Sequence, residues 1–114
     1  MVPLKTRKRH DTSYPLIVQL TDNNGPRVLT DSTAIVMTMT FLKTGIVKIN
    51  RAACTQLDQT LFPGQIKYAW QAADVDTAAM FRVEWEISFT DGTKATWPSD
   101  DYCSQLILED LDAT

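Results

Sequence analysis

Large apolar residues alternate with polar residues along positions 81–89, which read FRVEWEISF. The apolar positions are Phe81, Val83, Trp85, Ile87 and Phe89. Successive side chains of a strand point to opposite faces of its sheet, so this period of two predicts a strand that is buried on one side. Asp91-Gly92 follows, a pair that is typical of tight hairpin turns. The pattern therefore predicts a hairpin in which residues 94–97 form the return strand.

The same alternation recurs along most of the chain. Beside this hairpin, strands are predicted over residues 14–22, 34–43, 64–70 and 101–111, and over 46–57 as one irregular strand or two short ones. Asn24-Gly25 and Thr44-Gly45 supply turn residues between these runs. Six or seven alternating runs, with turn signals at intervals of about ten residues, predict an all-β fold, an antiparallel β-sandwich of about seven strands.

The segment 71–80, QAADVDTAAM, interrupts this alternation. Its alanines allow a single helical turn, with Asp74 or Asp76 as the capping residue. A crossover between two sheets and a functional loop are the two interpretations of its role. A calcium site at Asp74 and Asp76 is disfavoured, because calcium takes six or more oxygen ligands and no third carboxylate follows in the loop.

Composition indicates a single globular domain. The chain has 114 residues, 44% of them hydrophobic, and a net charge of −3, which gives no general argument for nucleic-acid or membrane binding. No apolar run is long enough to cross a bilayer. The first eleven residues lack the apolar segment and cleavage site of a signal peptide, so we expect synthesis in a cytoplasm.

The sequence predicts no catalytic centre. His10 is the single histidine, and it lies in a basic segment where it cannot serve as a fixed base for a nucleophile. Glu84 and Glu86 point the same way and could form a glycosidase pair, but the alternation places them on the solvent face. Cys54 and Cys103 are interpreted as buried apolar residues, with a disulfide or a reactive thiol as alternatives. We expect no enzyme activity, no cofactor and no metal.

The stretch from Gly64 to Leu111 resembles a pattern found in tailed bacteriophages. It reads GQIKYAWQAADVDTAAMFRVEWEISFTDGTKATWPSDDYCSQLILEDL. The upstream stretch LIVQLTDNNGPRVLTDSTAIVMTMTF resembles the opening of the same family. The resemblance is to the N-terminal domain of phage baseplate upper proteins and to related small immunoglobulin-like structural proteins of phages. It covers residues 14–111 and implies an immunoglobulin-like sandwich.

The resemblance implies a non-enzymatic virion protein, an adaptor that docks other structural proteins in the baseplate, tail or neck. The expected partners are other virion structural proteins and further copies of the chain on a symmetric assembly, and no membrane or nucleic acid. We expect the chain to hold only the docking part, with any adhesive activity in a partner. Two alternatives remain: a decoration protein (cement or head fibre) on the capsid surface, and a carbohydrate-binding module that uses Trp97 and Tyr102.

The two ends of the chain carry opposite charge. Residues 1–12 form a basic arm whose candidate docking residues are Lys5, Arg7, Lys8 and Arg9, and residues 112–114 form a short acidic tail. The sandwich is assigned to residues 13–111. The arm is interpreted either as a solvated tail or as a segment that becomes ordered on an acidic surface of a neighbouring virion protein. A nucleic-acid contact is disfavoured, because four fixed positive charges without an interleaved aromatic residue make a small footprint. Deleting residues 1–10 is then expected to leave thermal unfolding nearly unchanged.

Overall fold

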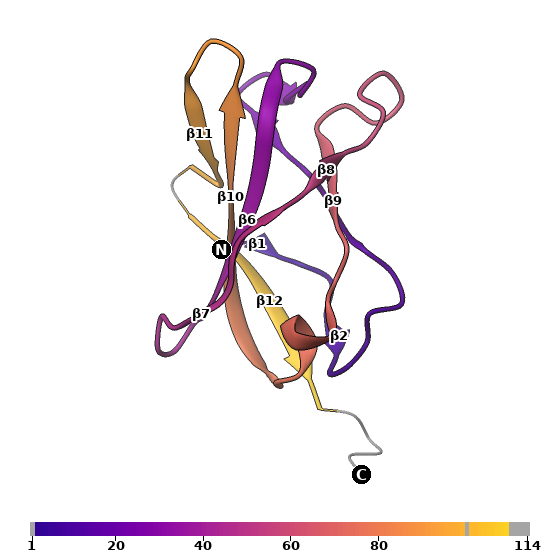
Figure 1. Cartoon of the computed structure of the whole chain (residues 1–114), viewed down its shortest axis with the longest axis vertical. Helices are drawn as coiled ribbons and strands as arrows, with labels where there is room; N and C mark the ends of the chain where they lie inside the picture. Colours follow the sequence, from indigo (N-terminus) through magenta and orange to yellow (C-terminus); the bar gives the residue numbers. More distant parts are fainter. Residues whose placement is uncertain (1, 100, 110–114) are drawn as a thin grey trace.

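The computed structural model describes residues 2–99 and 101–109 and is built almost wholly of strands (Figure 1). The strands are β1 (Val2–Pro3), β2 (Arg7–Lys8), β3 (Leu16–Gln19), β4 (Thr21–Asp22), β5 (Gly25–Pro26), β6 (Ser32–Phe41), β7 (Val47–Ala53), β8 (Thr55–Gln56), β9 (Gln65–Tyr68), β10 (Ala79–Phe89), β11 (Lys94–Trp97) and β12 (Cys103–Leu108). A short 3-10 helix, η1 (Ala72–Val75), is the single helix of the described residues. The all-β prediction is confirmed.

β10 is the central strand of the larger sheet, as the alternation over residues 81–89 predicted. It pairs with β6 along nearly its whole length, with Trp85 opposite Met37. Its other edge is shared by two strands, because β12 pairs with its first half and β11 with its second half. β7 lies beyond β6 and forms one edge of this sheet.

The smaller sheet has the order β3-β9-β8, and a separate hairpin joins β4 to β5. The chain passes from the larger sheet to the smaller one between β7 and β8, so residues 46–57 form two strands that belong to different sheets. One core cluster contains Leu16 and Ile66 from the smaller sheet with Met39 and Phe81 from the larger sheet. The immunoglobulin-like assignment stays a prediction.

The basic arm is part of the larger sheet, and the prediction that it lies outside the sandwich is wrong. β1 pairs with the first residues of β12 and β2 with the last, both in parallel orientation. Between them the Leu4 N–H donates to the Ser104 carbonyl at 2.8 Å, and the buried Gln105 amide donates to the Lys5 carbonyl at 2.9 Å. Arm residues thus cover an edge of β12 that would otherwise be open. The predicted acidic tail, 112–114, lies outside the described residues.

The predicted helical turn exists as η1, and Asp74 acts at its first turn. Gln71 is the N-cap residue, and its backbone N–H donates to the Asp74 carboxylate at 2.8 Å. The Tyr68 hydroxyl, from β9, donates to the same carboxylate at 2.5 Å. Burial, and after it this hydrogen bond, raises the pKa of Tyr68. Asp74 therefore fixes the link between β9 and β10, so a structural role accounts for this buried acid.

Candidate functional site

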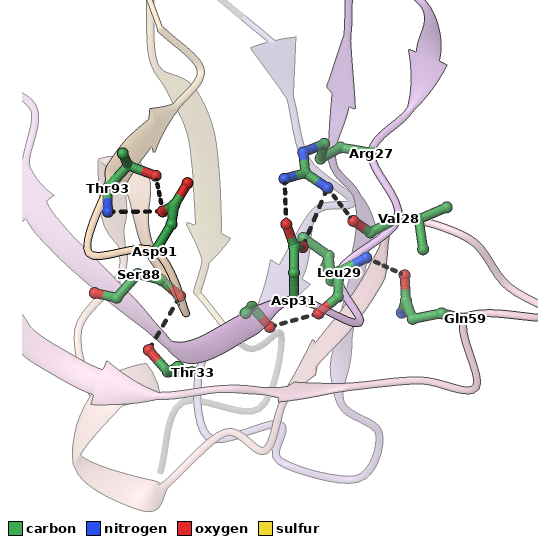
Figure 2. A network of polar contacts seen from close by, with 10 residues as sticks. Arg27, Val28, Leu29, Asp31, Thr33, Gln59, Ser88, Asp91 and Thr93 are labelled. Carbon is green, nitrogen blue, oxygen red and sulfur yellow. Dashed lines mark hydrogen bonds and ion pairs between the residues drawn. The ribbon is translucent and has the colours of Figure 1, made fainter.

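Three loops meet at the end of the sandwich where β6 begins and β10 ends. We call this the loop end: residues 20–31, 57–64 and 90–93. Figure 2 shows the Arg27 guanidinium facing the Asp31 carboxylate, with an N–O distance of 3.0 Å, and also donating to the Val28 carbonyl. The same guanidinium lies 4.6 Å from the centre of the Phe89 ring. These contacts join the first loop to the end of β10.

Gln59 holds the second loop, 57–64, against the first. Its buried side-chain carbonyl accepts the backbone N–H groups of Leu29 at 3.1 Å and Gly64 at 2.8 Å. Its amide group donates to the carbonyls of Leu57 at 2.9 Å and Gln65 at 3.2 Å. The bond from the Leu29 N–H to the Gln59 side-chain carbonyl is drawn in Figure 2. A satisfied buried amide of this kind gives the loop one conformation.

Asp58 orders the outer part of the same loop. Its carboxylate accepts the backbone N–H of Thr60 at 2.9 Å, and its own carbonyl accepts the N–H of Phe62 at 2.7 Å. Two large apolar residues follow at the tip: Leu61 is 69% exposed and Phe62 is 46% exposed. We call Leu61 and Phe62 the tip. The loop thus presents two apolar side chains to solvent on an ordered backbone.

Gly64 closes this loop, and Gly64→Ala is expected to lower the free energy of unfolding by roughly 2 kcal/mol. Its φ is +78°, and a Cβ there would lie 2.5 Å from the Leu20 carbonyl oxygen. Gly92→Ala is the matched control, because Gly92 also has a positive φ but nothing within 4 Å of the added Cβ. Urea denaturation of both variants checks the difference. Equal losses would show that the close approach to Leu20 has no energetic weight.

A cavity of about 320 Å³ lies between the β4–β5 hairpin and β11. Its floor is formed by core residues that include Leu20 and Ile87, and Trp97 and Phe89 line it. Asp22 and Asn23 stand at its polar side. Trp97, the tryptophan of the carbohydrate-binding alternative, is half-buried and packs on Trp85 with ring centres 5.7 Å apart. Its lining combines apolar and aromatic side chains with a few polar ones, which is the make-up of a binding site.

The opposite end of the sandwich carries an apolar hollow of about 610 Å³. It is lined by Phe41, Leu42, Lys43, Thr44, Ala79 and Met80. The residues come together because the Leu42 N–H donates to the Met80 carbonyl at 3.0 Å, which joins the β6–β7 turn to the start of β10. Ile46, 63% exposed, and Val47 follow in the same turn and strand. This end is the lower one in Figure 1.

The four predicted docking residues have unlike surroundings. Arg7 is buried; its guanidinium donates to the carbonyls of Asp11 at 3.0 Å and Tyr14 at 2.9 Å and lies over the rings of Tyr14 and Trp70. Burial lowers the pKa of Arg7, and the nearby Asp11 opposes that shift. Arg9 forms an ion pair with Glu109 at 3.1 Å.

Lys5 and Lys8 remain exposed, and Lys5 lies 4.9 Å from the centre of the Tyr14 ring. Only these two of the predicted residues are therefore open to a partner within the described part of the arm. A docking role for the arm stays a prediction, and it now concerns a surface that is already ordered.

The other candidate residues of the sequence are also placed. Glu86 lies on the solvent face of β10 as predicted, 3.2 Å from Arg51 and 3.7 Å from Lys94. A hydrogen bond from Arg51 lowers the pKa of Glu86, which keeps it ionised and unsuited to act as a general acid. Tyr102 packs under Arg82, 4.5 Å from its guanidinium, and does not line the cavity beside Trp97.

Cys54 and Cys103 are free thiols, half-buried and buried, as the first interpretation predicted. Burial raises the pKa of both thiols to about 11 from an ordinary value of 9.0. A thiol whose pKa is raised in the folded state contributes its full stabilisation at a pH below its pKa in the unfolded chain. This contribution is lost as the pH rises through the folded-state pKa.

The free energy of unfolding is therefore expected to fall between pH 9 and pH 11, the range set by the ordinary and the raised thiol pKa values. Urea denaturation across this range checks it, with the double variant Cys54→Ala, Cys103→Ala as the control. The double variant is expected to show a shallower decline. Parallel curves for the two proteins would contradict the assignment to the thiols.

Sequence reasoning missed the tip and the hollow. The tip residues Leu61-Phe62 lie between two predicted strands and belong to no alternating run, and their apolar character outside any run was the available signal. The hollow joins residues 41–44 to residues 79–80, which no local pattern connects.

Among residues 2–99 and 101–109, no group of three or more metal-ligating side chains is gathered in one place. In the same part of the chain, no helix is long and apolar enough to span a membrane. A scan against protein-family models finds no match, and a search of the curated proteins finds no significant match.

Proposed function

We propose that this chain is a non-enzymatic structural protein of a tailed-phage virion, an adaptor that docks other structural proteins in the baseplate, tail or neck. The observation that carries the adaptor role is the exposure of large apolar side chains at both ends of the sandwich. Leu61 and Phe62 stand at one end, and Leu42, Ile46 and Val47 at the other. Apolar patches of this kind on a domain with a filled core typically mark interaction sites.

The virion part of the proposal is supported by the sequence resemblance over residues 14–111. Its motifs are the strands and turns of the fold, and the Asp91-Gly92 turn among them is held by two Asp91–Thr93 hydrogen bonds, drawn in Figure 2. The larger sheet and the ordered arm support the adaptor role, because a rigid domain holds two partners at fixed positions relative to each other.

Mass spectrometry of purified phage particles tests the proposal. Particles are prepared from the strain whose DNA encodes the chain, and peptides of this protein are measured against those of the major capsid protein. We expect a constant ratio through successive purification steps. Loss of the peptides during purification, with the protein retained in the cell lysate, would overturn the virion role.

A carbohydrate-binding module is the second candidate, favoured by the position of Trp97 in the cavity beside Asp22 and Asn23. An aromatic ring beside hydrogen-bonding side chains suits a sugar ring. A glycan array with the wild-type protein and Asn23→Ala tests it, because Asn23 is exposed and its replacement leaves the core intact. Specific binding that the variant loses would favour this candidate over the adaptor.

A further inference from the structure

We propose that the tip of one copy inserts into the apolar hollow of a second copy, so that the protein assembles head to tail. This inference rests on the proposed structural function and names its partner as the chain itself. It follows from the form of the two surfaces, their place at opposite ends of the molecule and their charge.

The tip is suited to act as an anchor because its backbone is already ordered. The four hydrogen bonds of Gln59 and the capping bonds of Asp58 fix the loop in the isolated chain. Gly64 fits against the Leu20 carbonyl too closely for any side chain. Large apolar side chains on an ordered loop lose little entropy on binding and are the usual source of affinity in an interface.

The hollow is suited to receive such an anchor. Its lining includes the apolar residues Phe41, Leu42, Ala79 and Met80, and it is an open hollow of about 610 Å³ that side chains of a partner can enter. Met80 is exposed and the next residue, Phe81, is buried, because successive side chains of β10 point to opposite faces of the sheet. Filling the hollow with Leu61 and Phe62 would remove apolar surface from water on both copies.

The two surfaces lie at opposite ends of the sandwich. β6 and β10 are antiparallel, so Phe41 pairs with Phe81 at the hollow, while Ser32 pairs with Phe89 at the far end of the same two strands. Loop 57–64 is held to that far end through Leu29. Figure 1 shows this loop at the upper right of the molecule and the β6–β7 turn at the lower left. The tip of one copy therefore cannot reach the hollow of the same copy.

Charge complements the apolar contact. Asp58 is exposed directly before the tip, and Lys43 is an exposed wall residue of the hollow. Neither forms an ion pair with any other residue of the part that the structure describes. When the tip enters the hollow, the Asp58 carboxylate and the Lys43 ammonium of the two copies come into range. Opposite charges of this kind set the register of an interface.

Pairing through the β7 edge is disfavoured by the backbone. Arg51 has a φ of 53°, and the register with β6 shifts twice along this strand. Such irregularities protect an edge from adding a strand of another chain. Contact between unlike surfaces gives a ring if the rotation closes and a filament if it does not, and either form brings repeated copies to a symmetric partner.

Sedimentation velocity of the full chain, with two complementary variants, tests the proposal. Phe62→Asp removes the tip and leaves the hollow, and Leu42→Asp removes the hollow and leaves the tip. The wild type is expected to associate as its concentration rises, and each variant alone to weaken association at least about tenfold. A mixture of the two variants keeps one intact tip and one intact hollow, so it should form dimers and nothing larger. Circular dichroism confirms that both variants fold.

A pair of charge changes provides the second arm of the test. Lys43→Glu should weaken association, and Asp58→Asn in the same chain, which removes the opposing charge but keeps the side-chain oxygen that orders the loop, should recover part of the loss. A wild type that stays monomeric up to its solubility limit would overturn the inference, as would a mixture of the two variants that forms no dimer. Neither result would bear on the proposed virion role, because mass spectrometry of purified particles tests that role and does not depend on self-association.

Discussion

Replacing Trp85 with alanine is expected to lower the free energy of unfolding by ~3–5 kcal/mol, a large part of the stability of a domain of this size. Trp85 is 1% exposed in the middle of β10. It lies opposite the fully buried Met37 of β6 and against the Trp97 ring of β11. Its removal would leave a cavity that three strands line, and a closely packed core relaxes only in part around such a gap.

Trp85→Phe is the control, because it keeps an aromatic ring in the same place and is expected to lose less than half as much. Urea denaturation followed by circular dichroism gives both values without relying on tryptophan fluorescence. A loss below about 1 kcal/mol for Trp85→Ala would mean that the neighbours collapse into the gap, contrary to the central position argued for β10.

Arg7→Ala is expected to lower the free energy of unfolding by about 3 kcal/mol, from two hydrogen bonds of a charged donor at about 1.5 kcal/mol each. Arg7 as a residue is 7% exposed, and the carbonyls of Asp11 and Tyr14 that accept hydrogen bonds from its guanidinium would lose their donor. The loss of contact with the Tyr14 and Trp70 rings adds to the effect. Urea denaturation again measures it.

Lys8→Ala is the matched control, since Lys8 is the next residue of β2 and is exposed. Its replacement is expected to change stability by less than about 0.5 kcal/mol. Deleting residues 1–10 removes Arg7 together with both arm strands, so it should destabilise the protein by more than Arg7→Ala does. Truncation that leaves thermal unfolding unchanged would restore the interpretation of the arm as a free tail.

The strands could be predicted because alternation is a local signal. Ile66, Tyr68 and Trp70 are buried as their period of two indicates, and Lys67 between them is exposed. The break at residues 71–80 was equally visible, since alanines without alternation cannot continue a strand that is buried on one side. The signals that determine these elements therefore lie within about ten residues of each element.

The arm could not be predicted in this way. Arg7 stands between Thr6 and Lys8 in a run of basic residues, and nothing local distinguishes it from Lys5 or Arg9. Its burial depends on Tyr14 and Trp70, and the pairing of β2 depends on Ile107 and Leu108. A charge run is usually solvated, and only contacts over a long sequence separation made this one an exception.

The pairing of β1 and β2 with β12 also sets an order for folding. Val2 meets Cys103, and Lys8 meets Leu108, so each pair is separated by about a hundred positions. During synthesis the arm leaves the ribosome about a hundred residues before its partner strand. The core can begin to form around β6 and β10, but β1 and β2 cannot pair, and the Lys5 carbonyl cannot accept from Gln105, until β12 has emerged. We therefore expect the closing of this edge to be a late and comparatively slow step of folding.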